Sequence, residues 1–203
     1  MAIREIAQMG NPILYRRAVE VTDPTDPEIA RLANDMIDTL VHVGGSGIAA
    51  PQVYECRRLV VYRMSARLMD KAAESPDPWV VLVNPVLQPT GNETASGWER
   101  CLSIPGLHGK VPRYQNLRLS YQDLQGKEIA VDTQGPLAVL LQHECDHLDG
   151  VLYPMRMTDL SKLEFNAEPG HLAQDIIDGE PVWPVLRQLV EAWPGRSQWM
   201  DGQ

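Results

Sequence analysis

The chain has 203 residues, 44% of them hydrophobic, which suits one compact domain with a substantial core. No apolar run is long enough for a membrane span, and a formal charge of −9 argues against nonspecific binding to nucleic acid. The N-terminus has neither a secretory signal nor a transit peptide, so we expect a cytoplasmic protein. Its three cysteines, an odd number that fits no disulfide framework, are expected to be reduced: Cys56, Cys101 and Cys145.

The first half of the chain predicts one helix and two strands that follow an irregular N-terminal arm. Asp26 and Pro27 are typical of a helix start, and apolar residues at helical spacing continue until Gly44. Segments rich in valine and leucine predict strands at 58–64 and 79–87. We expect the polar stretch between these two strands to be a surface excursion.

A hairpin and a second helix are predicted next. Segments 117–123 and 127–133 are expected to pair across the turn Leu124-Gln125-Gly126. Gly135-Pro136 is typical of a helix start, and an apolar run continues to Gly150, which fits a C-terminal cap. The order of helix, strands, hairpin and helix predicts an α+β fold rather than a βαβ series.

Beyond residue 157 the chain becomes acidic. We expect residues 158–203 to form a partly helical extension, with 183–193 as its clearest helix, packed on the same domain as the catalytic residues 1–157.

The segment His143-Glu144-Cys145-Asp146-His147 is the most informative part of the sequence. Two imidazoles four residues apart on a helix lie one turn apart on the same face, so both can reach one transition-metal ion. Glu144 follows the first ligand directly, where a carboxylate can take a proton from metal-bound water. A catalytic metal site usually has three protein ligands and one open position. Candidates for the third ligand are Cys101 upstream and Glu164 or Glu168 downstream.

Besides the segment 143–147 and the segment around Cys101, a third one combines glycines, small residues and one amide: Gly45-Ser46-Gly47-Ile48-Ala49-Ala50-Pro51-Gln52. The glycines let the backbone approach a ligand closely, and Gln52 can donate a hydrogen bond to a developing oxyanion. Taken alone, this segment also fits a plain loop between a helix and a strand, just as Cys101 alone fits an ordinary buried cysteine.

Together, these segments resemble the three motifs of the peptide deformylase family. GSGIAAPQ is similar to G-φ-G-x-A-A-x-Q, ERCLS to E-G-C-φ-S and QHECDHLDG to Q-H-E-φ-D-H, where φ is an apolar residue. The resemblance covers residues 3–157 and implies an α+β fold whose small antiparallel or mixed sheets pack around a central helix that carries the metal motif. It implies removal of the formyl group from the N-terminal formyl-methionine of newly made polypeptides.

The resemblance also implies the residues of the site. Cys101, His143 and His147 would bind one divalent metal ion, with Fe(II) favoured and Zn(II), Ni(II) or Co(II) as alternatives. Glu144 would act as general base and then as general acid, while Gln52 and the backbone N–H of Leu102 would stabilise the oxyanion. The expected partners are N-formyl-methionyl nascent peptides. Seven further residues are predicted to contact the substrate: Gly45, Ser46, Gly47, Arg100, His108, Val139 and Leu140.

These seven residues have different predicted roles. The peptide would lie extended along the segment 45–47, its backbone pairing as an added strand, and Val139 and Leu140 would line an apolar methionine pocket. His108 stands where relatives often carry Arg close to the substrate. Glu99, Arg113 and Asp146 are predicted to form a charge network that orients the ligands, with a solvated surface role as the competing interpretation.

Two departures from the family motifs keep alternatives open. Arg100 stands where the second motif has glycine, and it would be strained if that position needs a positive φ. Ser46 is polar where the first motif has an apolar residue. A zincin-type metallopeptidase with Glu164 or Glu168 as ligand, and a catalytically silent deformylase-like peptide-binding protein, are the alternatives. We expect a monomer or homodimer, no direct nucleic-acid or membrane binding, and at most weak ribosome association because the extension has no basic helix.

Overall fold

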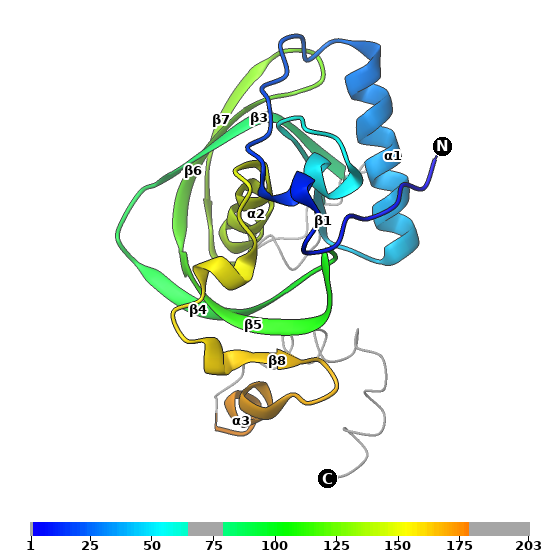
Figure 1. Ribbon diagram of the computed structural model, residues 1–203. Helices are drawn as coiled ribbons and strands as arrows, with labels where there is room; N and C mark the ends of the chain where they lie inside the picture. Colours follow the sequence, from blue (N-terminus) through cyan, green and yellow to red (C-terminus); the bar gives the residue numbers. More distant parts are fainter. Residues whose placement is uncertain (1, 65–78, 179–203) are drawn as a thin grey trace.

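The computed structural model describes residues 2–64 and 79–178, which form two antiparallel sheets and three α-helices (Figure 1). The five-stranded sheet has the order β1-β2-β3-β6-β7, with strands Gly47–Ala49, Leu59–Arg63, Trp79–Pro89, Asn116–Gln122 and Glu128–Gln134. The three-stranded sheet has the order β4-β5-β8, with strands Thr94–Cys101, Ile104–Tyr114 and Leu163–Phe165. The predicted α+β fold is confirmed.

Helix α1, Pro27–Val43, begins and ends where the sequence predicts. The Asp26 side chain accepts a hydrogen bond from the Glu28 N–H at 2.8 Å, and Gly44 closes the helix in the left-handed conformation, with φ of 75°. Its apolar face packs against strands of the five-stranded sheet, through buried side chains such as Met36 and Leu40.

Helix α2, Gly135–Leu148, carries the metal motif and contacts strands of both sheets (Figure 1). Leu141 and Leu148 are fully buried among side chains of the large sheet, including Leu82 and Leu119. Burying apolar side chains of this size stabilises the fold by roughly 1.5–3 kcal/mol each. Because one side of α2 is anchored in this way, its other residues are held at a defined distance from β4 and β5.

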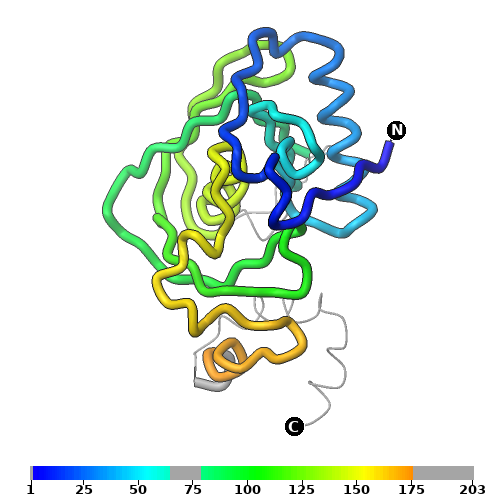
Figure 2. Tube along the Cα trace, in the orientation of Figure 1, coloured from blue at the N-terminus to red at the C-terminus, as the bar shows by residue number. Residues whose placement is uncertain are grey.

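The N-terminal arm crosses the C-terminal end of α2, and Figure 2 shows the two segments side by side. The Ala18 N–H donates to the Leu148 carbonyl at 2.7 Å. Gly150 has a φ of +73°, and a Cβ on it would lie 2.7 Å from the carbonyl carbon of Tyr15, so only glycine fits this crossing. The arm also contains the 3₁₀ helix η1, Pro12–Tyr15.

The strands β2 and β3 and the hairpin β6–β7 confirm the corresponding predictions. The hairpin β4–β5 and the short strand β8 were not predicted. Besides η1, the described chain contains three more 3₁₀ helices, which are η2, Ala50–Val53, η3, Tyr153–Arg156, and η4, Leu160–Lys162. The predicted excursion at 65–78 and the predicted helix at 183–193 lie outside the described residues.

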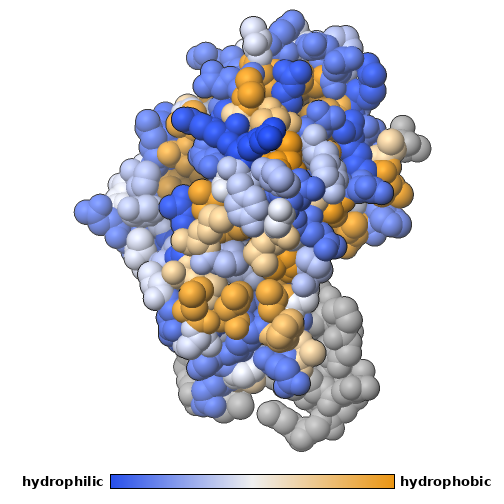
Figure 3. Space-filling view, viewed as in Figure 1, coloured by the Kyte–Doolittle hydropathy of each residue, from blue (hydrophilic) through white to orange (hydrophobic). Residues whose placement is uncertain are grey.

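In the described part of the acidic extension, η4 is followed by β8, which pairs with β5, and then by α3, Gly170–Asp178. Apolar side chains gather in the part of Figure 3 that β5 and β8 occupy in Figure 1. Phe165 of β8 is 66% exposed. None of the helices in the two described ranges is long and apolar enough to cross a membrane.

Candidate active site

Three ligand side chains converge from two elements. Cys101 ends β4, and His143 and His147 lie one turn apart on α2. One ligand atom from each residue lies within 4.8 Å of the others, and Cys101 Sγ is 3.2 Å from His147 Nε2. Cys101 and His147 are buried, and the His143 side chain is 11% exposed. A thiolate and two imidazoles drawn together in this way form a donor set that fits a divalent transition metal.

Glu144 lies beside these ligands in a closed environment. It is 3% exposed, and its Oε2 has no hydrogen-bond partner among the residues that the structure describes. Burial raises the pKa of its carboxyl to about 7, with the charge of His143 opposing and that of Glu99 reinforcing the shift. A carboxyl with a pKa near 7 can both take and release a proton at neutral pH.

Gly47 makes room for this carboxylate. A Cβ at Gly47 would lie 2.6 Å from Glu144 Oε1 and 2.9 Å from Glu144 Cδ, distances that no real Cβ contact shows. The glycine of the first motif therefore lets strand β1 lie directly against the Glu144 carboxylate. This close approach is to a side chain of the protein itself, and the approach to a ligand that the sequence indicates for the segment stays a prediction.

The Gln52 side chain is held at both ends. Its Oε1 accepts a hydrogen bond from the Ala49 N–H at 2.9 Å, and its Nε2 donates to Ser103 Oγ at 3.2 Å and contacts Cys101 Sγ at 3.6 Å. The amide donor group therefore points to the Cys101 sulfur and the Ser103 hydroxyl. Leu102, whose N–H is the other predicted oxyanion donor, lies in the turn between β4 and β5.

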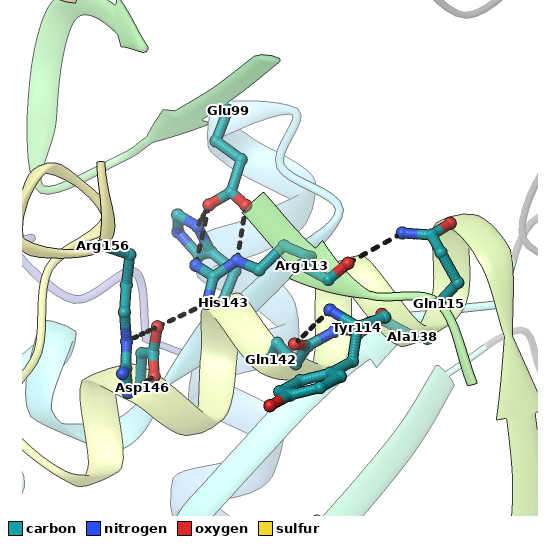
Figure 4. A network of polar contacts seen from close by, with 9 residues as sticks. All are labelled: Glu99, Arg113, Tyr114, Gln115, Ala138, Gln142, His143, Asp146 and Arg156. Atoms are coloured by element: carbon teal, nitrogen blue, oxygen red, sulfur yellow. Dashed lines mark hydrogen bonds and ion pairs between the residues drawn. The ribbon is translucent and has the colours of Figure 1, made fainter. Parts of the chain in front are cut away.

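A buried charge network supports His143, as Figure 4 shows. Glu99 Oε2 lies 2.8 Å from His143 Nδ1 and accepts its hydrogen. Arg113 donates to both carboxylate oxygens of Glu99, at 2.7 and 3.0 Å, and to Asp146 Oδ2 at 2.6 Å. Burial raises the pKa of Glu99, but hydrogen bonds from His143 and Arg113 outweigh it and lower the pKa to about 2. The predicted network of Glu99, Arg113 and Asp146 is confirmed, and it fixes the ring of His143.

Residues 3–163 match the family described as Polypeptide deformylase. The chain belongs to the polypeptide deformylase family.

Curated relatives and solved structures agree with this assignment. The chain is 42% identical to Peptide deformylase 1 of Bordetella pertussis over 164 residues, which cover 80% of this chain and 92% of the relative. It is also 42% identical to Peptide deformylase 1 of Nitrosomonas europaea over 163 residues, with the same two coverages.

Among solved structures, the peptide deformylase from Thermotoga maritima superposes with a TM-score of 0.70 at 30% identity, covering 78% of this chain and all of that one. The class I type b peptide deformylase from Acinetobacter baumannii bound to Met-Ala-Ser has a TM-score of 0.68 at 33% identity, covering 77% of this chain and all of that one.

The deformylase motif at 45–47 leads into β1, which is an edge strand of the five-stranded sheet. Ser46 is exposed, and its carbonyl accepts a hydrogen bond from the Arg63 N–H at 2.9 Å. Val139 and Leu140 are half-buried on α2. Their predicted contacts with substrate stay predictions, and their positions are compatible with them.

Arg100 and His108 belong to the hairpin β4–β5. In the described ranges, the non-glycine residues with a positive φ are Tyr54 and Asn84. Arg100 therefore does not have the positive φ that would have strained its backbone in place of the motif's glycine. Register places His108 on the face of the hairpin that carries Trp98, opposite the face of Glu99. His108 is fully buried there, so this geometry does not support its predicted contact with substrate.

The downstream carboxylates lie elsewhere. Glu164 in β8 pairs with His171 and lies 3.4 Å from His108 Nε2, and Glu168 is exposed. Within the described ranges, the group of side chains able to hold a metal contains Cys101 and neither of these carboxylates. A zincin arrangement with Glu164 or Glu168 as third ligand therefore has no geometric support.

Sequence reasoning gave no role to three residues that shape this deformylase site. Ser103 holds the Gln52 amide, Tyr153 packs its ring against His143, and Arg156 donates to Asp146. The final serine of the second motif was the available signal for Ser103. Tyr153 and Arg156 contact His143 and Asp146 only once the chain has folded, so the sequence carried no signal for them.

Proposed function

We propose that this chain removes the formyl group from the N-terminal formyl-methionine of newly made polypeptides by metal-assisted hydrolysis. The observation that carries the proposal is the convergence of Cys101, His143 and His147 beside the buried carboxylate of Glu144. Family membership supports the same reaction.

Cys101, His143 and His147 would hold a divalent cation, which would supply a Lewis acid for activating water and polarising the formyl carbonyl. Glu144 takes a proton from the attacking water as the water oxygen bonds to the formyl carbon, and it gives that proton to the nitrogen when the C–N bond breaks. The products are formate and a free amine. Gln52 Nε2 and the Leu102 N–H meet the negative charge on the formyl oxygen, where one such donor contributes about 3–4 kcal/mol.

Fe(II) is the proposed native ion, and Zn(II), Co(II) or Ni(II) would also fit the donor set. A thiolate ligand donates more charge than imidazole or carboxylate, so it moderates Lewis acidity and suits each of these ions. Of the two histidines, His143 has its Nδ1 engaged by Glu99, which leaves its Nε2 for the ion.

The substrate would extend along 45–47 and add its backbone to the edge strand β1. Val139 and Leu140 would contact the methionine side chain from α2, and Arg100 and His108 would contact the rest of the peptide. His108 would have to leave its buried position to do so.

We also propose the wider setting of the reaction. Residues 1–157 form the catalytic domain, and 158–203 form an extension, whose strand β8 pairs with β5. The chain acts in the cytoplasm as a monomer or homodimer, on nascent formyl-methionyl peptides, with at most weak ribosome association.

Formate release from a formyl-methionyl peptide by the Fe(II) protein, prepared anaerobically, tests the proposal. We expect turnover that Glu144→Ala abolishes without loss of metal. Tight binding of the formyl peptide with no turnover in the unsubstituted chain would favour a silent peptide-binding protein. Metal retention by Cys101→Ala, with cleavage of internal peptide bonds, would favour the zincin alternative.

A further inference from the structure

We propose that η3 positions the metal-binding ring of His143, and that Arg156 is a positioning residue acting on this ring through three other charged side chains. The inference rests on the proposed function, because it takes His143 as a metal ligand. It concerns a part of the chain that lies outside the three family motifs.

Arg156 makes a bidentate contact with the carboxylate of Asp146. Its Nη2 donates to Oδ1 at 2.7 Å and its Nε lies 3.2 Å from Oδ2, as the left side of Figure 4 shows. Two parallel N–H···O contacts fix the plane of a carboxylate as well as its position. Asp146 is 8% exposed, so its charge must be matched inside the protein.

The oriented carboxylate then holds Arg113. Asp146 Oδ2 accepts from Arg113 Nη1 at 2.6 Å, and the other two nitrogens of Arg113 hold Glu99. Glu99 in turn accepts from His143 Nδ1. An unbroken series of charged hydrogen bonds therefore runs from η3 to the imidazole.

The charges of this series balance only when Arg156 is included. Arg113 is 4% exposed and lies between two carboxylates, those of Glu99 and Asp146. Without Arg156, both carboxylates would depend on the single guanidinium of Arg113, and Asp146 would compete with Glu99 for it. We expect the hydrogen bond from Glu99 to His143 to loosen as a result.

Tyr153, at the other end of η3, restrains the same ring directly. Its ring is nearly parallel to that of His143, with an interplanar angle of 23° and centroids 6.2 Å apart. Gly109 lies close to the tyrosine ring, since a Cβ at Gly109 would be 2.9 Å from Tyr153 Cε2. One four-residue helix therefore orients His143 both by packing and through charges.

The half-exposed position of Arg156 separates this role from simple stabilisation. Its side chain is 50% exposed, and ion pairs at such positions contribute little to stability. Arg118 is the matched control, since its side chain is 48% exposed and donates to Asp132 across the hairpin β6–β7. The two aspartates differ, since the Asp146 side chain is 11% exposed and that of Asp132 is 71% exposed. A role in stability alone therefore predicts a change in melting temperature with an unchanged Co(II) spectrum, whereas a positioning role predicts an altered metal site at Arg156 alone.

The experiment compares Arg156→Gln with Arg118→Gln. The affinity of each metal-free protein for Zn(II) is measured by competition with a chelator, and the visible spectrum of each Co(II) form is recorded. We expect Arg156→Gln to weaken Zn(II) binding about tenfold and to shift the Co(II) bands, since outer partners of metal ligands typically contribute about 10–100-fold in affinity. Arg118→Gln should match the unsubstituted chain, and Arg156→Lys should recover part of the affinity.

Equal Zn(II) affinity and equal spectra for the two glutamine variants would overturn the inference. The Asp146→Asn background gives a second criterion, because Arg156→Gln should add no further loss there. An undiminished loss in that background would show that Arg156 does not act through Asp146, and would also overturn it. Formate release by the unsubstituted chain is measured in parallel, so a failure of the proposed function is seen separately from a failure of this inference.

Discussion

Gly47→Ala tests whether strand β1 sets the position of the Glu144 carboxylate, the proposed general base. The new Cβ would lie 2.6 Å from Glu144 Oε1, and ordinary van der Waals contact begins at 3.4 Å. The carboxylate must therefore retreat by about 0.8 Å, which the end of a flexible side chain can do without unfolding the protein. A misplacement of about 1 Å in a catalytic group costs on the order of 10²-fold in rate, or about 2.7 kcal/mol in the barrier.

The assay is formate release under saturating formyl-methionyl peptide, together with thermal unfolding. We expect kcat to fall about 10²-fold while the melting temperature changes little. Gly97→Ala in β4 is the matched control, because a Cβ there meets nothing within 4 Å, and it should retain full activity. Equal kcat for the two variants would refute the reasoning, as would a loss confined to KM.

Two other predictions concern the surroundings of the site. Ser103→Ala removes a hydrogen bond that holds the Gln52 amide, so kcat should fall about tenfold in the formate assay, less than for removal of Gln52 itself. Asp175→Asn removes the carboxylate that joins α3 to the hairpin β4–β5 through hydrogen bonds from Lys110 and Trp98. Burial raises the pKa of Asp175, but these two hydrogen bonds outweigh burial and lower the pKa below the usual 3.8. The carboxylate therefore stabilises the fold above that pH and loses this contribution below it. The difference in melting temperature between this variant and the unsubstituted chain should be full at pH 7 and shrink below pH 3.8; a constant difference would contradict it.

Helices were predictable where the signals are local. The start of α1 depends on Asp26, which caps its own helix, and its end on Gly44, which adopts the left-handed conformation. The turn of the hairpin β6–β7 is likewise encoded by neighbouring residues, with Gly126 at a φ of 76°.

The hairpin β4–β5 could not be predicted in this way. Its second strand contains Pro105, Gly106, Gly109 and Pro112, which are unfavourable in a strand interior. The strand forms because β4 and β8 pair with its two edges, and a bulge before Cys101 shifts the register. The pairing of β5 with β8 joins segments more than fifty residues apart, so no local pattern reports this part of the sheet.

In the candidate site too, the residues with a local sequence signal were predicted, and Arg156, which is joined to them by tertiary contacts, was not. The spacing of His143, Glu144 and His147 on one helix is a local signal, and the family motif added Cys101. The support of His143 by Arg156 joins η3 to β5 and β4 through buried charges, and it exists only once the two sheets have packed around α2.

The central claim is that Cys101, His143 and His147 hold one metal ion beside Glu144. A crystal of the metal-loaded protein, with anomalous diffraction collected at the edge of the bound metal, tests it most directly. We predict a single strong peak, bonded to Cys101 Sγ at about 2.3 Å and to both imidazoles at about 2.0–2.1 Å if the ion is Zn(II). A peak without sulfur among its ligands, or one away from these three side chains, would contradict the account.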